Sequence, residues 1–416
     1  MIPVRSTPVA TAVILSMAFA AIAAEPVKPD VQRKGDLWSV VVDGVDVNFC
    51  IPSHRKELRG VLLKPADKNV ADQQNAWTAA VASWGFGECG MLLRDMNRGN
   101  RPRILSEAFR KALSLVAEAS GHPELPRLPF VATGFSKGGG WARDLSRLNP
   151  DRAIGYVNVC CWMGGDLAKV PPEYLGIPGL YILGSVPDGF KMLPTIEAEY
   201  VPAMQRGRVL WTCALSWGAA HDWLPPTTPY AVTYLDQVVR MRLPAESPAA
   251  GTPPALREMK WEEGWMGDRS TWDAPCPSIA SFADYTGTWD NASWQPNRYL
   301  AHVWRAYMTR TPEVTFAGIA ADSLILENPG RAEYGVASDT RLTITAQLKD
   351  GVEARSVSFY DGDVPLGHVA SKPYTFAWHR VPAGNHAVIA VANLANEGGL
   401  RSSPILWVSG VPEPDR

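Results

Sequence analysis

The segment Phe130-Val131-Ala132-Thr133-Gly134-Phe135-Ser136-Lys137-Gly138-Gly139 decides the fold of the N-terminal half of this chain. The apolar and β-branched residues before Gly134 predict a buried strand, and the residues after Gly138 predict the start of a helix. Between them, the pattern Gly-x-Ser-x-Gly predicts a sharp, strained turn. The glycines let two chain segments approach each other while the Ser136 hydroxyl projects outward. A serine held in this way can act as a nucleophile.

The residues that could activate Ser136 follow it in the chain. An alkyl alcohol needs a base, usually histidine, and the base needs a carboxylate to orient it. A second apolar strand, predicted at 177–184, ends just before Asp188, and a third, predicted at 209–215, runs into a loop that contains His221. Of the seven histidines, His221 alone follows both Ser136 and Asp188 at the end of a strand in this part of the chain. We therefore expect His221 as the base and Asp188 as the acid.

A second carboxylate stays open as the acid. Asp166 follows a strand predicted at 153–159, and it is the alternative to Asp188. Asp222 is a poorer choice because adjacent residues in a loop rarely point at each other.

The wider pattern predicts an α/β fold. An Asp43-Gly44 turn inside 37–52 predicts an antiparallel hairpin at the edge of a sheet. Apolar strands and helical stretches then alternate, which is typical of a mostly parallel, doubly wound sheet with helices on both faces. The strands are predicted near 60–64, 90–94, 129–133, 153–159, 179–184 and 209–215, and the helices near 75–83, 102–120, 138–148, 193–206 and 229–242. Ligands bind such sheets outside the carboxyl ends of the strands, where all three candidate residues lie.

Residues 37–243 resemble the α/β-hydrolase superfamily, on the evidence of Gly-Phe-Ser-Lys-Gly-Gly followed by Asp188 and then His221. They look most like its secreted esterase and polyester-depolymerase branches. The resemblance implies that Ser136 is the nucleophile, His221 the general base and then acid, and Asp188 the orienting carboxylate.

The same resemblance implies an oxyanion hole. The backbone N–H of Lys137, directly after the serine, would supply one donor. The other would come from the loop after strand 60–64, where Ala66 or Asp67 is expected because Pro65 has no N–H. Trp162, four residues before the alternative acid Asp166, and Trp223, two residues after His221, are expected to contact the substrate.

Beyond Leu243 the composition changes twice. A Pro-rich stretch at 244–254 predicts a linker. The segment after it is dense in tryptophan. These tryptophans are expected to pack an extension onto the hydrolase, and a platform that binds substrate is the less favoured alternative. From about Pro312, alternating residues between turns predict a β-sandwich. Residues 359–392 resemble bacterial Ig-like modules, which usually serve as spacers or weak adhesion domains. The expected units are a signal peptide at 1–24, a catalytic domain at 25–245, the linker and Trp-rich extension at 246–311, and the Ig-like β-sandwich at 312–416.

The composition and the N-terminal segment indicate where the protein acts and which kinds of partner are disfavoured. The first 24 residues have the layout of a secretory signal, so a secreted or periplasmic protein without a membrane anchor is expected. A net charge of −2 does not favour nucleic-acid binding. Six cysteines in an exported chain predict one or two disulfides, with free buried thiols as the alternative. No cofactor or metal is expected.

The sequence thus predicts a secreted serine esterase that works through an acyl-enzyme, with an acylated polysaccharide or another polymeric or aryl ester as substrate. Two other functions stay open: a serine peptidase of the same fold, and a non-catalytic surface-binding protein built on a hydrolase scaffold. The oligomeric state is not predicted.

Overall fold

The structure is a computed structural model of the 416-residue chain. It describes residues 30–66, 76–161, 172–186, 193–206, 209–245, 252, 254–328, 333–394 and 400–411. The predicted signal peptide lies outside these residues.

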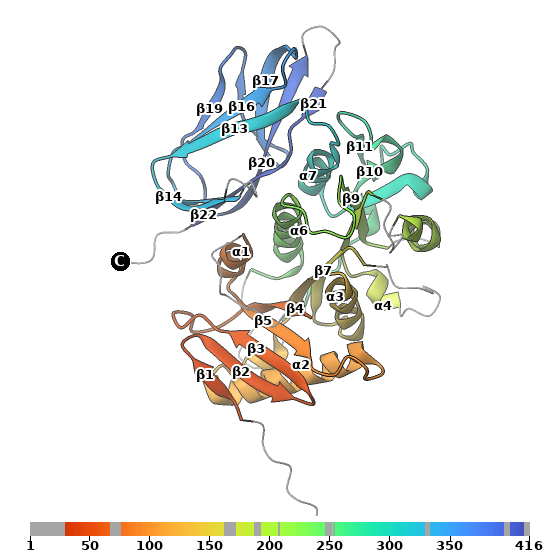
Figure 1. Ribbon diagram of the computed structural model, residues 1–416, viewed down its shortest axis with the longest axis vertical. Coiled ribbons are helices and arrows are strands. Elements are labelled where there is room, and N and C mark those ends of the chain that lie inside the picture. Colours follow the sequence, from red (N-terminus) through yellow and green to blue (C-terminus); the bar gives the residue numbers. More distant parts are fainter. Residues whose placement is uncertain are drawn as a thin grey trace, which may run out of the picture.

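A nine-stranded sheet forms the N-terminal half, in the order β1-β2-β3-β5-β4-β6-β7-β8-β9 (Figure 1). The strands are β1 (Gln32–Lys34), β2 (Leu37–Val42), β3 (Val45–Cys50), β4 (Gly60–Pro65), β5 (Phe86–Leu93), β6 (Phe130–Phe135), β7 (Ala153–Val159), β8 (Gly179–Gly184) and β9 (Trp211–Ser216). The run from β5 to β9 is parallel, and β1 to β3 pair antiparallel. This mostly parallel sheet with an antiparallel edge confirms the predicted α/β-hydrolase fold.

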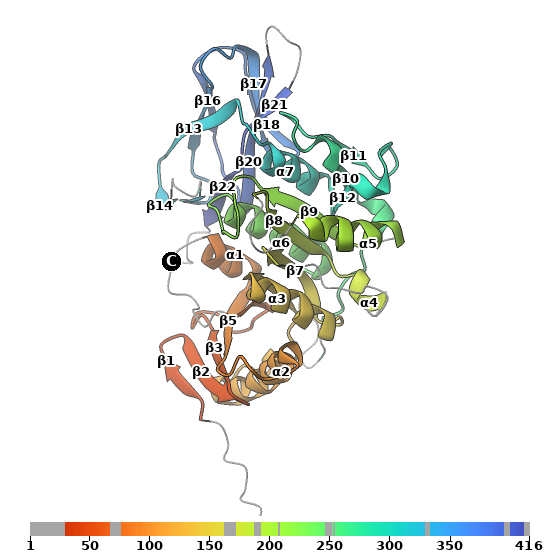
Figure 2. The ribbon, with the colours of Figure 1, turned by 45° about the vertical axis from the view of Figure 1, so that its right-hand side comes forward.

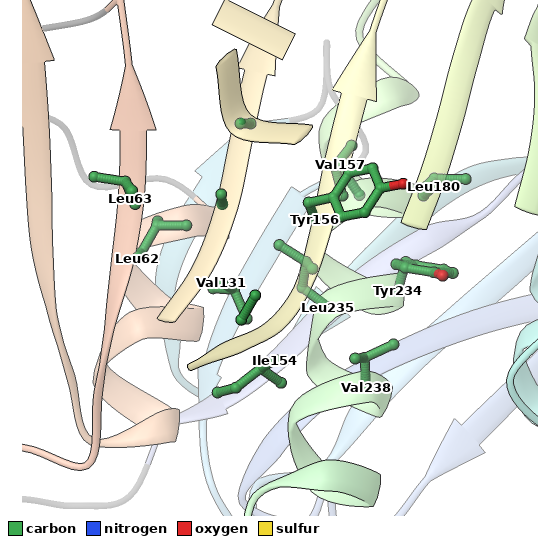
Figure 3. Packing of buried hydrophobic residues seen from close by; sticks show 14 of the residues in the cluster. Leu62, Leu63, Val131, Ile154, Tyr156, Val157, Leu180, Tyr234, Leu235 and Val238 are labelled. Carbon is green, nitrogen blue, oxygen red and sulfur yellow. The ribbon is translucent and has the colours of Figure 1, made fainter. Parts of the chain in front are cut away.

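Helices cover both faces of the sheet. The helices are α1 (Ala76–Trp84), α2 (Arg101–Ser120), α3 (Lys137–Leu148), α4 (Pro172–Leu175), α5 (Val201–Arg206) and α6 (Thr227–Arg242). Helices α1 and α6 lie together on one face, and α2 and α3 lie on the other (Figures 1 and 2). Figure 3 shows Tyr234, Leu235 and Val238 of α6 beside strand β7, which carries Ile154 and Tyr156, and a Cβ on Gly155 between them would lie 2.9 Å from Val238 Cγ1. All of these side chains are fully buried, so this layer is the centre of the core.

The Trp-rich extension is folded and packs on the edge of the sheet. It contains β10 (Trp265–Asp268), β11 (Ile279–Ser281), β12 (Ala292–Gln295) and α7 (Arg298–Met308). Trp294 and Trp304 are completely buried, which agrees with the packing role expected of the tryptophans. Trp289 differs, since 38% of its surface is exposed.

Side chains of the extension bond to the backbone groups at the open edge of β9, the last strand of the sheet. The Cys213 N–H donates to Ser293 Oγ at 3.0 Å, and the Cys213 carbonyl accepts from Ser293 Oγ and from the Trp304 indole, each at 2.9 Å. Two residues on, the Leu215 N–H lies 3.2 Å from the Met308 sulfur. An exposed strand edge is a template for pairing with other chains, so these side chains replace the missing neighbour strand.

The C-terminal region is a sandwich of two sheets. One has the order β13-β16-β19 and the other β14-β15-β22-β20-β17-β18, with β21 paired to β20. Their bounds are β13 (Val314–Ala321), β14 (Leu324–Asn328), β15 (Glu333–Ala337), β16 (Leu342–Leu348), β17 (Ala354–Asp361), β18 (Val364–Val369), β19 (Tyr374–Trp378), β20 (Gly384–Leu394), β21 (Leu400–Ser402) and β22 (Leu406–Val411). The two sheets enclose a hydrophobic core of their own, which confirms the predicted Ig-like sandwich.

The Ig-like region packs directly against the hydrolase half. Strands β20 and β22 lie beside α1 and α6, as Figures 1 and 2 both show. Five of its residues belong to the same hydrophobic core as the large sheet: Ala387, Ile389, Val391, Ile405 and Trp407. The predicted domain boundaries stay a prediction, but the module adds these five side chains to the core of the large sheet besides enclosing a core of its own.

The disulfide prediction is wrong, because none of the six cysteines, all of which lie among the described residues, forms a disulfide. Cys89 and Cys213 are fully buried in separate strands of the large sheet. The adjacent thiols contact different groups: Cys160 Sγ lies 3.7 Å from the Asp222 carbonyl, whereas Cys161 Sγ lies against Gly140. Among the helices of the described residues, none combines the length and the apolar character needed to cross a membrane.

Candidate functional site

Ser136 lies in a strained turn between β6 and α3. Its φ is 54° and its ψ −126°, a backbone conformation that L-residues rarely adopt. The turn is so tight that a Cβ on Gly134 would lie 2.3 Å from the carbonyl carbon of Gly138. Only glycine fits there, as the sequence predicted, and the result is a partly exposed serine at the carboxyl end of a central strand.

The start of α3 faces the turn that follows β4. A Cβ on Gly138 would lie 2.7 Å from the Pro65 carbonyl oxygen and 3.4 Å from the Ala66 Cβ. Ala66 has a φ of 73°, so the chain turns sharply at this point. Lys137 is exposed and is the first residue of α3, where backbone N–H groups point out of the helix. Lys137 and Ala66, the two residues predicted to form an oxyanion hole, therefore lie on segments that touch. Asp67 lies outside the described residues.

His221 lies beside the serine turn. It belongs to the segment between β9 and α6, residues 217–226, which we call the histidine loop. The His221 ring centroid is 4.9 Å from that of Phe135, the residue directly before Ser136. The fold thus brings His221 against the residue that precedes Ser136, although the two are far apart in the chain.

The loop after β8 is tied to the histidine loop. The Val186 N–H donates to the Ala219 carbonyl at 2.9 Å, and the Gly218 N–H donates to Ser185 Oγ at 2.8 Å. A Cβ on Gly184 would collide with the Ala220 carbonyl oxygen, so the two segments are in close contact. Asp188 follows Val186 by two positions but lies outside the described residues. Asp166 and Trp162 lie outside them as well.

Trp223 forms part of the site's aromatic surroundings. Its ring lies 6.4 Å from that of Phe135 in an edge-to-face arrangement, and its indole N–H donates to Thr228 Oγ1 at 2.9 Å. Phe135, His221 and Trp223 therefore form a partly exposed aromatic surface next to Ser136. The contribution of Phe135 was not predicted, although its place in the Gly-x-Ser motif could have indicated it.

Sequence reasoning also missed the residues that hold the histidine loop from outside. Trp217 donates its indole N–H to the Met308 carbonyl at 2.8 Å, and Tyr307 lies 3.3 Å, oxygen to oxygen, from Thr227. Both partners come from α7, some eighty to ninety residues further along the chain. No local pattern in the sequence indicates such a contact.

A metal centre was not predicted, and the described part of the chain contains no group of three or more His, Cys, Asp or Glu side chains placed to bind an ion.

Comparison with known families identifies the C-terminal module. A family model described as a bacterial Ig domain matches residues 332–390. This chain is also similar to fibronectin(III)-like modules of Clostridium thermocellum CbhA, with 24% identity, coverage of 24% of this chain and 100% of that one, and a TM-score of 0.18. A search of curated proteins found no match.

The hydrolase half is similar to solved esterases and hydrolases. A cold-adapted esterase from an Arctic intertidal metagenomic library is 18% identical, over 50% of this chain and 96% of that one, with a TM-score of 0.32. A dienelactone hydrolase from Anabaena variabilis is 20% identical, over 51% of this chain and 95% of that one, also with a TM-score of 0.32. Scores this low carry no argument about activity. The fold assignment depends on the strand order and on the turn at Ser136.

Proposed function

We propose that this protein is a serine hydrolase that cleaves carboxylic esters through an acyl-enzyme. The proposal is supported above all by Ser136, which has a positive φ in the turn between strand β6 and helix α3, and by His221, whose ring centroid lies 4.9 Å from that of Phe135, the residue before Ser136. A strained serine at a strand end beside an imidazole has the arrangement of an activated nucleophile.

In the proposed reaction, Ser136 Oγ attacks the ester carbonyl while His221 accepts the hydroxyl proton. The negative charge on the carbonyl oxygen is stabilised by the N–H groups of Lys137 and Ala66. His221 then gives the proton to the leaving alcohol, and a water molecule releases the acid by the reverse sequence. Asp188 orients the imidazole and stabilises its charged form.

The proposed substrate is an acylated polysaccharide or another polymeric or aryl ester outside the cell. Two features support this choice: the aromatic surface of Phe135 and Trp223 next to Ser136, and a bacterial Ig domain on the same chain. Aromatic rings stack well on aryl and sugar groups. Export would depend on residues 1–24, which have the layout of a secretory signal.

Labelling with a fluorophosphonate probe tests the reaction class. The wild-type protein should be labelled and should hydrolyse an activated aryl ester. Ser136→Ala should not be labelled, and its kcat should be lower by at least about 1,000-fold. Ser114→Ala, which changes a serine on the exposed side of α2, is the matched control and should behave as wild type. An unlabelled wild-type protein without ester turnover would make the scaffold alternative correct.

The identity of the acid is tested separately. We expect Asp188→Asn to lower kcat by about 10⁴-fold, because the imidazole loses its orientation. Asp166→Asn should leave ester turnover within about threefold of wild type. The opposite pair of results would assign the acid to Asp166.

A further inference from the structure

The histidine loop begins and ends against the same helix of the extension. Ser216 is the last residue of β9 before the loop, and Thr227 is the first residue of α6 after it. Both are buried, with exposed fractions of 4% and 0%. The C-terminal end of α7, at Tyr307 and Met308, contacts both positions.

Tyr307 lies between the two ends of the loop. Its hydroxyl is 3.3 Å from Thr227 Oγ1, and its ring stacks on that of Tyr230 with centroids 4.4 Å apart. Burial raises the pKa of the Tyr307 phenol to about 12, while hydrogen bonds with the side chains of Ser216 and Thr227 oppose that rise. The phenol therefore stays protonated at neutral pH and can bond to both ends of the loop.

Met308 and its neighbours hold the first residue of the loop. Trp217 donates its indole N–H to the Met308 carbonyl at 2.8 Å, and its ring packs edge to face on Trp272. The Arg310 guanidinium lies 5.0 Å above the same ring and is held by an ion pair with Asp273. The extension thus fixes Trp217 on several sides, four residues before His221.

We infer that the C-terminal end of α7 positions the histidine loop, and that Tyr307 is a positioning residue for His221. This inference rests on the proposed function, because it assigns the Trp-rich extension a part in the same reaction. Tyr307 acts through Ser216 and Thr227 and does not touch the reacting atoms. Holding a base within a fraction of an ångström of its productive position is worth one to two orders of magnitude in rate.

Tyr307→Phe removes the hydroxyl and keeps the ring stack on Tyr230. We expect kcat for an activated ester to fall about tenfold, with KM within about twofold of wild type. Rates are to be expressed per active site, counted by fluorophosphonate labelling, so that unfolded protein does not contribute. Wild-type kcat in Tyr307→Phe would overturn the inference.

Tyr230→Phe is the matched control. It removes a buried phenol from the other ring of the same stack, but that hydroxyl has no hydrogen-bond partner among the described residues. Its kcat should match wild type. A similar loss of kcat in both variants would show that the Tyr307–Tyr230 ring stack is merely structural, and it would overturn the inference.

Thr227 offers a rescue pair. Thr227→Val removes the hydroxyl that contacts Tyr307 and should reproduce the tenfold loss, whereas Thr227→Ser keeps the hydroxyl and should restore kcat to within about twofold of wild type.

Amide hydrogen exchange separates this inference from the proposed function, because it needs no turnover. Peptides covering residues 216–226 should exchange faster in Tyr307→Phe than in wild type and Tyr230→Phe. Faster exchange in a protein without esterase activity would support the loop contact and reject the function. Unchanged exchange together with unchanged kcat in an active enzyme would reject the inference and keep the function.

Discussion

The serine turn depends on the absence of side chains at its glycines. A Cβ on Gly134 would overlap the backbone of Gly138 and Gly139, with contacts of 2.3–2.7 Å that no rotamer can relieve. We predict that Gly134→Ala lowers the melting temperature by several degrees and abolishes fluorophosphonate labelling. Thermal unfolding followed by circular dichroism and gel-based labelling measure the two effects.

Gly99→Ala is the control for this change, since a Cβ at Gly99 meets no atom within 4 Å. It should leave both the melting temperature and the labelling unchanged. Labelling of Gly134→Ala at the wild-type rate would show that the turn tolerates a side chain and that its tightness is not required.

At the scale of single residues, the sequence predicts those features that depend only on neighbouring residues in the chain. The strain at Ser136 follows from glycines two positions on either side, so it could be predicted from five residues. The approach of Phe135 to His221 and of Tyr307 to Thr227 could not, because each pair meets only after the sheet has assembled.

Among the elements, β9 depends most on residues outside its own sheet. Ser293→Ala would leave the buried Cys213 N–H without its partner, whereas the Cys213 carbonyl would keep the Trp304 indole. We predict a loss of about 1–3 kcal/mol in the free energy of unfolding, measured by urea denaturation. Ser281→Ala, on the outer strand β11 where the serine bonds to an exposed aspartate, should cost less than about 0.5 kcal/mol. Equal losses in both variants would contradict the edge-capping role.

The elements of the hydrolase half were predicted well because each carries its own periodicity. Strands β7 and β8 are buried along their whole length and could be recognised as continuous apolar runs. The extension was harder, since β10 to β12 have only three or four residues each, and its tryptophans indicate burial without indicating a strand or a helix. The segment predicted as one helix at 193–206 is a π-helical turn at Ile196–Tyr200 followed by α5.

Across the whole molecule, a buried polar network joins the Ig-like region to the hydrolase half. Asp236 of α6 accepts hydrogen bonds from the Trp84 indole at 2.8 Å and from the Asn385 amide at 2.9 Å, and it pairs with Arg240 at 2.7 Å. The Asn385 amide also donates to Ser83 Oγ at 2.9 Å. The module is therefore held in one orientation, which differs from the flexible spacer that such modules usually provide.

Asn385→Ala tests this junction. Removing the amide withdraws one hydrogen bond from the buried Asp236 carboxylate and one from the Ser83 hydroxyl. We predict a loss of about 1–3 kcal/mol in the free energy of unfolding and faster proteolysis between the two parts. Asn393→Ala, on the exposed side of the same strand, should change neither. Resistance to protease equal to wild type would contradict a tight junction.

A contact inside the Ig-like region, one residue after Asn385, is sensitive to pH. His386 Nδ1 lies 2.7 Å from Asp361 and Nε2 lies 3.0 Å from the Pro382 carbonyl, with the Trp378 ring and Arg240 nearby. Burial lowers the pKa of His386, but the hydrogen bond and charge of Asp361 outweigh it, so that the pKa lies above its ordinary value of 6.5.

The folded protein therefore binds this proton more tightly than the unfolded chain does. The stabilisation is complete below about pH 6.5 and is lost as the pH rises through the raised pKa. We predict that the melting temperature of wild type falls relative to that of His386→Gln between about pH 6 and pH 9. Parallel curves for the two proteins would contradict the prediction.

The contact between the module and the large sheet has a practical consequence for anyone who wishes to work with the hydrolase half alone. Ala387, Ile389, Val391, Ile405 and Trp407 fill space between the module and the helices of the large sheet. A truncated chain that stops before Pro312 would expose the apolar surfaces that these residues cover, and such surfaces promote aggregation. Low solubility of a truncated product would therefore say nothing about its chemistry, and activity is best measured on the full-length protein.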